Sequence, residues 1–151
     1  MYRMGGRMAA ASGAAIGNVA ANIWNPHATV RPRVAELSIC LAAATAGTFQ
    51  IRRTTAIGAT FGATITPDID NDIQRSQTPT SGLLLYLAGF GTQPTVDASV
   101  LFQWNMPAAV GAGISLPLEI SIPPSTGLAV VTGVAALFPI SDISIAWREE
   151  N

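Results

Sequence analysis

The sequence has few charges, and lysine is missing from it altogether. Its 151 residues include eight Arg, nine acidic residues and one His, while 49% are hydrophobic. A soluble domain usually covers about a quarter or more of its surface with charges of both signs, which keep it monomeric. So little charge predicts a subunit whose surface is largely in contact with other protein.

A single cysteine, Cys40, and a single histidine, His27, exclude several kinds of reactive site. One cysteine cannot form an intramolecular disulfide, and its apolar neighbours predict that Cys40 is buried. One histidine leaves a zinc site short of nitrogen donors, and no nucleophile, base and carboxylate trio is marked. Asp97, Glu119 and Asp142 could supply a carboxylate pair for glycoside hydrolysis, but any β-sandwich offers such candidates. We therefore expect no enzyme.

Basic patches and long apolar runs are also missing. The net charge is −1 and the arginines are scattered, so nucleic acid is not an expected partner. The uncharged stretches 76–96, 98–118 and 120–141 are each interrupted by proline and polar residues. A membrane helix needs about 20 mostly apolar residues, so we expect no membrane partner. The N-terminal segment lacks the apolar centre of a signal peptide.

What the sequence does contain is alternation of apolar and polar residues with a period of two, the pattern of half-buried strands. The alternation is seen in 37–41, 100–105, 114–122 and 143–147. With 49–53, 83–88, 128–132 and a possible strand at 60–66, this gives about eight short strands separated by Gly- and Pro-rich turns. They predict an all-β, antiparallel β-sandwich. A jelly roll is favoured, and another eight-stranded sandwich stays open.

Two details of strand pairing follow from the turns and the prolines. The turn at Ala46-Gly47 predicts that 37–41 and 49–53 pair as an antiparallel hairpin. Pro117 lacks the N–H that a central strand needs, so the segment 114–122 is predicted to be an edge or bulged strand.

Residues 1–30 are rich in Gly and Ala and are expected to form an extended N-terminal arm, with the sandwich over 31–151. The arm is expected to lie across neighbouring subunits and clamp them. Segments 83–88 and 128–132 are expected to support self-association, as a trimer. The arm residues predicted at the interface are Arg3, Arg7, Ile16, Val19, Ile23 and Trp24.

Three carboxylates, those of Asp68, Asp70 and Asp72, share one loop at alternate positions. Oxygen ligands at this spacing suit Ca²⁺. An EF-hand is excluded because its sixth and twelfth positions are here Ile73 and Pro79. A calcium loop and a solvated acidic loop both remain open, and Ca²⁺ is the only cofactor that the sequence suggests.

The chain contains several short motifs, among them Ile51-Arg-Arg-Thr-Thr55, Pro79-Thr-Ser-Gly82, Gln93-Pro-Thr95 and Trp104-Asn-Met-Pro-Ala108. These motifs resemble those of small structural proteins from the virions of tailed bacteriophages. The resemblance spans about residues 50–132 and implies a β-sandwich protein that decorates the head or belongs to the tail. The motifs mark turns and strand ends, so no functional residue is carried over.

Together these features predict a virion structural protein, assembled in the host cytoplasm. The expected role is head decoration, in which self-association and an N-terminal clamp stabilise a capsid, with the major capsid or tail proteins as partners. The alternative is a calcium-assisted glycan- or receptor-binding module of a tail or fibre, which would use the Asp68–Asp72 loop and an exposed tryptophan.

Overall fold

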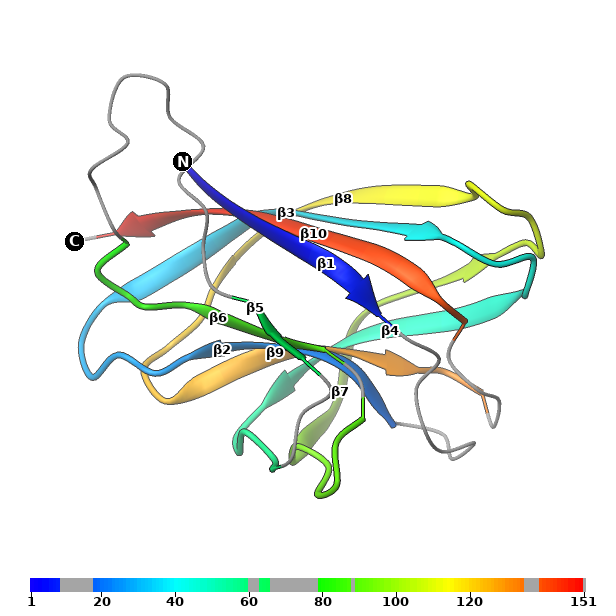
Figure 1. Ribbon diagram of the computed structural model, residues 1–151. Helices are drawn as coiled ribbons and strands as arrows, with labels where there is room; N and C mark the ends of the chain where they lie inside the picture. The colour runs from blue at the N-terminus through cyan, green and yellow to red at the C-terminus, as the bar shows by residue number, and fades with distance from the viewer. Residues whose placement is uncertain (9–17, 60–62, 66–78, 88, 135–138, 151) are drawn as a thin grey trace.

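The protein is seen in a computed structural model that describes residues 1–8, 18–59, 63–65, 79–87, 89–134 and 139–150. In these residues the chain is all-β, and two antiparallel sheets lie face to face (Figure 1). The predicted antiparallel β-sandwich is therefore confirmed. The strands are β1 (Tyr2–Met8), β2 (Val19–Asn25), β3 (Arg31–Leu41), β4 (Gly47–Thr54), β5 (Ala63–Ile65), β6 (Leu84–Leu87), β7 (Val96–Met106), β8 (Gly113–Ser121), β9 (Thr126–Thr132) and β10 (Ser141–Glu150).

One sheet has four strands in the order β1-β10-β3-β8, and the other has six in the order β5-β6-β2-β9-β4-β7. Apart from β5 and β6, the strands pair from the ends of the chain inward. β1 pairs with β10, β2 with β9, β3 with β8, and β4 with β7. Successive pairs alternate between the two sheets, so these eight strands follow the course of one long hairpin folded over on itself.

The core lies between the two sheets and follows from the alternation along the strands. Leu37 and Ile39 of β3, Phe49 and Ile51 of β4, and Trp147 of β10 are each at most 1% exposed. Successive side chains of a strand point to opposite faces, so each of these strands sends every second side chain into the core. Burial of this apolar area provides the main drive for folding.

A second, smaller apolar cluster lies outside this core. It includes Trp24 of β2 and Tyr86 of β6, with Phe90 from the segment between β6 and β7 packed against them. That segment is tied to the one after β4 by backbone hydrogen bonds between Ala59 and Thr92. Burial raises the pKa of the Tyr86 hydroxyl. The six-stranded sheet is thus covered by protein over part of both of its faces.

The expected separation between an arm over 1–30 and a sandwich over 31–151 is wrong. β1 pairs with β10 at an edge of the four-stranded sheet, and β2 lies between β6 and β9 inside the six-stranded sheet. Every residue of β2 is buried. A strand covered on both faces has no alternating pattern, and its small residues leave room for both layers. Its sequence therefore shows no period of two, and it directly follows a stretch rich in Gly and Ala.

The predicted hairpin between 37–41 and 49–53 is also wrong. β3 belongs to the four-stranded sheet, where its neighbours are β10 and β8. β4 belongs to the six-stranded sheet, between β9 and β7. Residues 42–46 therefore connect the two layers. Alternation shows which face of a strand is buried, but it does not show which strand lies beside it.

The prediction drawn from Pro117 is confirmed. β8 is the outer strand of the four-stranded sheet, next to β3. Its register with β3 shifts between Val34 and Glu36, which pair with Ile120 and Pro117. Glu119, in the shifted stretch, has a φ of 49°. Proline and the bulge together mark β8 as a strand that accepts no further neighbour.

Candidate protein-protein interface

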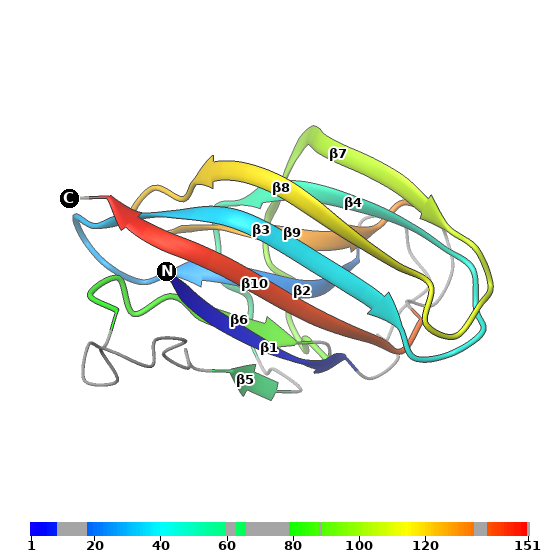
Figure 2. The ribbon, with the colours of Figure 1, turned by 90° about the horizontal axis from the view of Figure 1, so that it is seen from above.

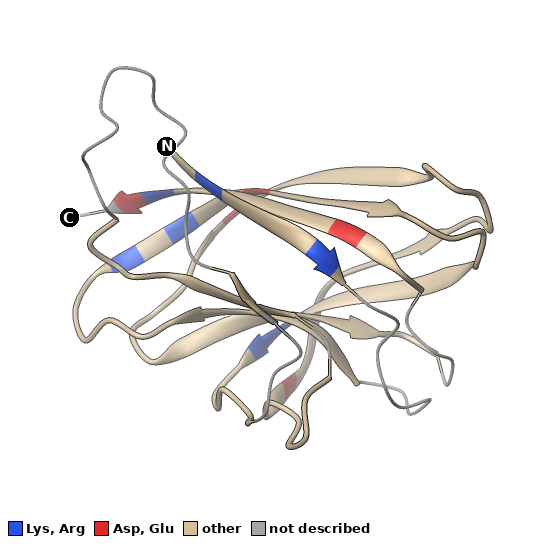
Figure 3. Cartoon of the chain, in the orientation of Figure 1, with Lys and Arg blue, Asp and Glu red and all other residues tan. Residues whose placement is uncertain are grey.

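The charged residues gather on one of the two layers (Figure 3). Of the twelve Arg, Asp and Glu residues whose side chains the structure describes, nine belong to the four-stranded sheet. The six-stranded sheet carries only Arg52, Arg53 and Asp97 among them. The nine are Arg3, Arg7, Arg31, Arg33, Glu36, Glu119, Asp142, Arg148 and Glu149.

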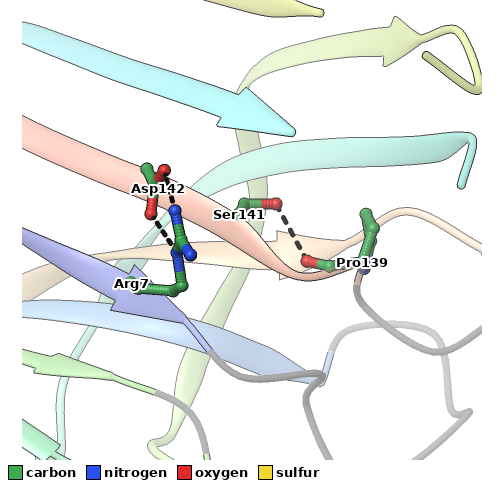
Figure 4. A network of polar contacts seen from close by, with 4 residues as sticks. All are labelled: Arg7, Pro139, Ser141 and Asp142. Atoms are coloured by element: carbon green, nitrogen blue, oxygen red, sulfur yellow. Dashed lines mark hydrogen bonds and ion pairs between the residues drawn. The ribbon is translucent and has the colours of Figure 1, made fainter. Parts of the chain in front are cut away.

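Arg7 of β1 and Asp142 of β10 form the clearest ion pair on the four-stranded sheet (Figure 4). Nε and Nη2 of Arg7 donate to the two carboxylate oxygens of Asp142 at 2.7 and 2.9 Å. The hydrogen bond from Arg7 lowers the pKa of Asp142, and Asp142 raises the pKa of Arg7. Both side chains are about half exposed or more, so solvent screens the pair and its contribution to stability is small.

Glu36 of β3 anchors a second polar network on this sheet. Its Oε1 accepts hydrogen bonds from Ser115 Oγ of β8 at 2.5 Å and from Ser38 Oγ at 3.0 Å. The bond from Ser115, followed by that from Ser38, lowers the pKa of Glu36. On the same sheet Glu119 pairs with Arg33 and Arg148. Several of the charges on this sheet are therefore satisfied by groups of the same chain.

Cys40 lies on the outer face of the same sheet, so the prediction that it is buried is wrong. Its neighbours along β3, Ile39 and Leu41, point into the core and are each 1% exposed. Cys40 must therefore face outward, because side chains alternate along a strand. It lines a shallow depression together with Asp142 and Ser144 of β10.

The edge of the six-stranded sheet at β7 has a different character. β7 pairs with β4 and with no other described strand, and it follows the margin of the molecule in the view of Figure 2. Val100 is 41% exposed and Phe102 is 39% exposed. Trp104 is half-buried and stacks on Phe49 of β4, with ring centroids 5.6 Å apart. The face of β7 that carries Phe102 and Trp104 is therefore aromatic and only partly covered, whereas Val100 lies opposite Arg52, beyond a shift of register.

The other face of β7 carries amide side chains in place of charges. Gln50 Nε2 of β4 donates to Gln103 Oε1 at 2.5 Å, and Thr48 Oγ1 donates to Asn105 Oδ1 at 2.7 Å. These residues are directly opposite one another across the two strands. Arg52 turns back to Gln50, where its Nε donates to Oε1 at 2.9 Å. β7 itself thus carries no charge near Gln103, and the guanidinium of Arg52 on β4 is the charge that lies close to it on this face.

The uncharged surface continues into the connection between β7 and β8. Val110 in this connection is 70% exposed. Gly111 has a φ of 81°, which favours glycine, and its N–H donates to the Leu41 carbonyl at 2.8 Å. That bond fastens the connection to the end of β3. Val100, Phe102 and Val110 make up half of the six most exposed large hydrophobic residues in the described part of the chain.

The structure places the interface residues predicted for the arm in two different environments. Arg3 and Arg7 belong to β1, on the charged sheet. Val19 and Ile23 are each 1% exposed and Trp24 is 9% exposed, all within the chain's own core clusters. The prediction that these three contact a neighbouring subunit is wrong, because β2 is an inner strand with neighbours on both sides.

In the part of the chain that the structure describes, most side chains of the two segments expected to support self-association are buried as well, and Leu84 is half-buried. Leu83, Leu85 and Leu87 are at most 2% exposed, and so are Leu128 and Val130. Their side chains belong to the main core. They hold the two sheets of one subunit together and present no surface to a second subunit.

The remaining predicted site residues, Ile16, Asp68, Asp70 and Asp72, lie outside the described residues. Within the described ranges, no three His, Cys, Asp or Glu side chains come together as metal ligands do. The same ranges contain no helix long and apolar enough to cross a membrane. The calcium loop therefore stays a prediction from sequence.

Sequence reasoning identified the alternation of Val100, Phe102 and Trp104 but not the open edge to which they belong. The sequence does contain a signal for this edge. Between Asp97 and Glu119 the sequence contains no charged residue. An exposed strand usually carries charge or proline, so an uncharged strand pattern of this length indicates either a central strand or a contact surface.

No protein family, curated protein or solved structure gives a significant match.

Proposed function

We propose that this chain is a structural protein of a tailed-bacteriophage virion, which stabilises a protein shell by binding other subunits and catalyses no reaction. A head decoration or cement protein is the form of this role that we favour. Its partners are then further copies of itself and the major capsid or tail proteins, and its location is the assembled particle.

The nested pairing of strands supports the proposal. The pairs β1/β10, β2/β9, β3/β8 and β4/β7 alternate between two sheets, which is the order expected when a long hairpin is wrapped into a jelly roll. Jelly rolls are common in viral capsid proteins, although lectins and cupins share them. A fold by itself does not determine a function, so a surface able to bind other subunits is also required.

The observation that carries the proposal is the uncharged edge formed by β7. Most described charges lie on the four-stranded sheet, whereas β7 exposes Val100 and Phe102 and has one acid, Asp97, near its start. Contact surfaces between proteins lose charge and gain aromatic residues at their centre. We propose that this edge takes over the contact role first expected for residues 1–30.

The test is the protein content of purified particles. If the gene lies in the genome of a tailed bacteriophage, mass spectrometry of gradient-purified virions should find the chain in many copies per particle. Particles prepared without it should lose integrity at a lower temperature and regain it when the purified chain is added. A gene outside any viral genome, or particles that lack the chain, would contradict the proposal.

A further inference from the structure

Each sheet of the sandwich ends in two outer strands, and three of these four edges carry a feature that prevents pairing with another chain. β1 bears Arg3 and Arg7, and β5 is only three residues long. β8 contains Pro117 and a bulge at which Glu119 has a positive φ. Charges, proline, bulges and shortness are the means by which proteins keep sheet edges from pairing.

The fourth edge, β7, is 11 residues long and contains no Lys, Arg or Pro. Its first half is irregular, because the register with β4 shifts on either side of Arg52. Asp97, in that half, accepts a hydrogen bond from the nearby N–H of Ser99. From Phe102 to Met106 the register with β4 is unbroken. An uncharged stretch of five regular strand residues is thus left open on one side.

We infer that β7 pairs with β7 of a second copy of this chain, antiparallel and across a two-fold axis at Trp104, so that the two six-stranded sheets become one. This inference rests on the proposed function and names the surface through which the subunits meet. An edge strand offers unpaired N–H and C=O groups, which an antiparallel copy of the same strand matches. A two-fold contact of this kind closes on itself.

The side chains of the regular stretch complement one another in this register. Gln103 of one copy lies opposite Asn105 of the other, and the same pair recurs on the other side of the axis. The amide oxygens of Gln103 and Asn105 already accept bonds from Gln50 and Thr48. Each side chain still has an NH₂ group to donate, and each oxygen has a second lone pair to accept with. The polar ladder across β4 and β7 would therefore continue into the second copy.

On the opposite face, Phe102 of one copy lies across from Met106 of the other, and the two Trp104 side chains meet at the axis. Directly opposed side chains in a sheet have Cβ atoms about 5 Å apart, which allows aromatic and thioether groups to touch. Phe102 is 39% exposed in the single chain, so pairing would remove apolar surface from water. The expected product is a two-fold dimer, in place of the trimer predicted from sequence.

Charge exchange at Gln103 and Asn105 tests this register directly. Both side chains are exposed, so lysine or glutamate there should leave the fold intact, and thermal unfolding of each variant verifies this. In Q103K/N105K, lysine faces lysine twice across the axis. In Q103K/N105E, each lysine faces a glutamate of the other copy. A matched control for added charge is C40K/S144K, which puts two lysines on exposed positions of the four-stranded sheet.

Sedimentation velocity of the full chain over a concentration series gives the dimer dissociation constant. The salt concentration is about 0.1 M, at which charges about 5 Å apart are barely screened. We expect Q103K/N105K to raise this constant at least tenfold, with Q103K/N105E and C40K/S144K within about threefold of wild type. Like charges directly opposite one another destabilise a strand pair, and opposite charges stabilise it.

The inference is overturned if Q103K/N105K associates as well as wild type, or if Q103K/N105E dissociates as fully as Q103K/N105K. Association lost only in C40K/S144K would also overturn it and would place the contact on the four-stranded sheet, with the proposed function unaffected. A wild-type chain that is monomeric throughout overturns the pairing as well. The proposed function is decided separately, by the protein content of the particles.

Discussion

Asn22 and Thr54 form a hydrogen bond that passes over an intervening strand. Thr54 Oγ1 of β4 donates to Asn22 Oδ1 of β2 at 3.0 Å, and both residues are fully buried. β9 lies between β2 and β4, and its Gly127 is opposite Trp24 of β2 on one side and Thr54 of β4 on the other. A Cβ on Gly127 would lie 2.5 Å from Thr54 Oγ1 and 2.5 Å from the Ile23 carbonyl oxygen. The absence of a side chain at Gly127 makes room for this bond.

Gly127→Ala should therefore destabilise the fold by about 2–3 kcal/mol, because overpacking a full core costs this much and the buried bond must also shift. The measurement is urea unfolding followed by tryptophan fluorescence. Gly113→Ala is the matched control, since its Cβ would come no closer than 3.3 Å to any neighbour. Equal losses in the two variants would show that Gly127 has no special role.

The ion pair between Arg7 and Asp142 predicts a dependence of stability on pH. Arg7 lowers the pKa of Asp142 in the folded chain, so ionised Asp142 stabilises the fold above the ordinary aspartate pKa of about 3.9. That stability is lost as the pH falls through the lowered value. The free energy of unfolding of wild type should exceed that of Asp142→Asn by a small amount at about pH 6, and the difference should shrink as the pH falls below about 4.

The control for this titration is Arg7→Gln, which removes the guanidinium that bonds both carboxylate oxygens of Asp142. Without that partner, the pH profile should run parallel to that of Asp142→Asn. A difference between wild type and Asp142→Asn that stays constant from pH 3 to pH 6 would contradict the assignment.

His27 has a structural role in the turn between β2 and β3. Its Nδ1 accepts hydrogen bonds from the backbone N–H groups of Thr29 and Val30 at 3.1 and 3.0 Å. His27→Ala removes this acceptor and should lower the free energy of unfolding by about 1 kcal/mol. His27→Asn places an amide oxygen where Nδ1 now lies and should recover most of the loss. Equal destabilisation in the two variants, measured by urea unfolding, would argue against this role.

Deletion of residues 2–22 tests whether the N-terminal segment is a removable arm or a pair of strands that the fold requires. An arm could be removed from a folded sandwich, but this deletion takes all of β1 and half of β2. β2 is an inner strand, and its loss would expose the buried side chains of β6 and β9 to water. We expect the truncated chain to be insoluble or to lack a cooperative thermal transition. A soluble product that unfolds cooperatively would contradict the strand assignments of β1 and β2.

Most of the strands could be predicted from sequence, some because they alternate and others, such as β6 and β9, because turn residues bound a short apolar run. The segments 83–88, 114–122 and 143–147 correspond to β6, β8 and β10 within a few residues. β2 escaped prediction because both of its faces are buried. β1 escaped because Gly5 and Gly6 interrupt its pattern, and a Cβ on Gly5 would lie 2.7 Å from the Ile143 carbonyl oxygen. The neighbours of each strand depend on the whole fold and not on its own sequence.

The candidate interface was harder to locate, for a related reason. A strand such as Val96–Met106, whose one charge is Asp97 near its start, has the composition of an inner strand. Only the order of the sheet shows that β7 has a single partner among the described strands. The low overall charge did point to contacts with other protein. Which surface makes those contacts depends on how charge divides between the two sheets, and this division follows from the pairing of strands far apart in sequence.

The most direct test of the account is the mass of the purified wild-type chain by light scattering, as a function of protein and salt concentration. The account predicts that the mass rises with concentration from 15.6 kDa toward twice that value. It also predicts that salt does not reverse the association, because the contact is uncharged and apolar burial strengthens in salting-out salts. A mass of one subunit at every concentration, or a dimer that added salt dissociates, would contradict it.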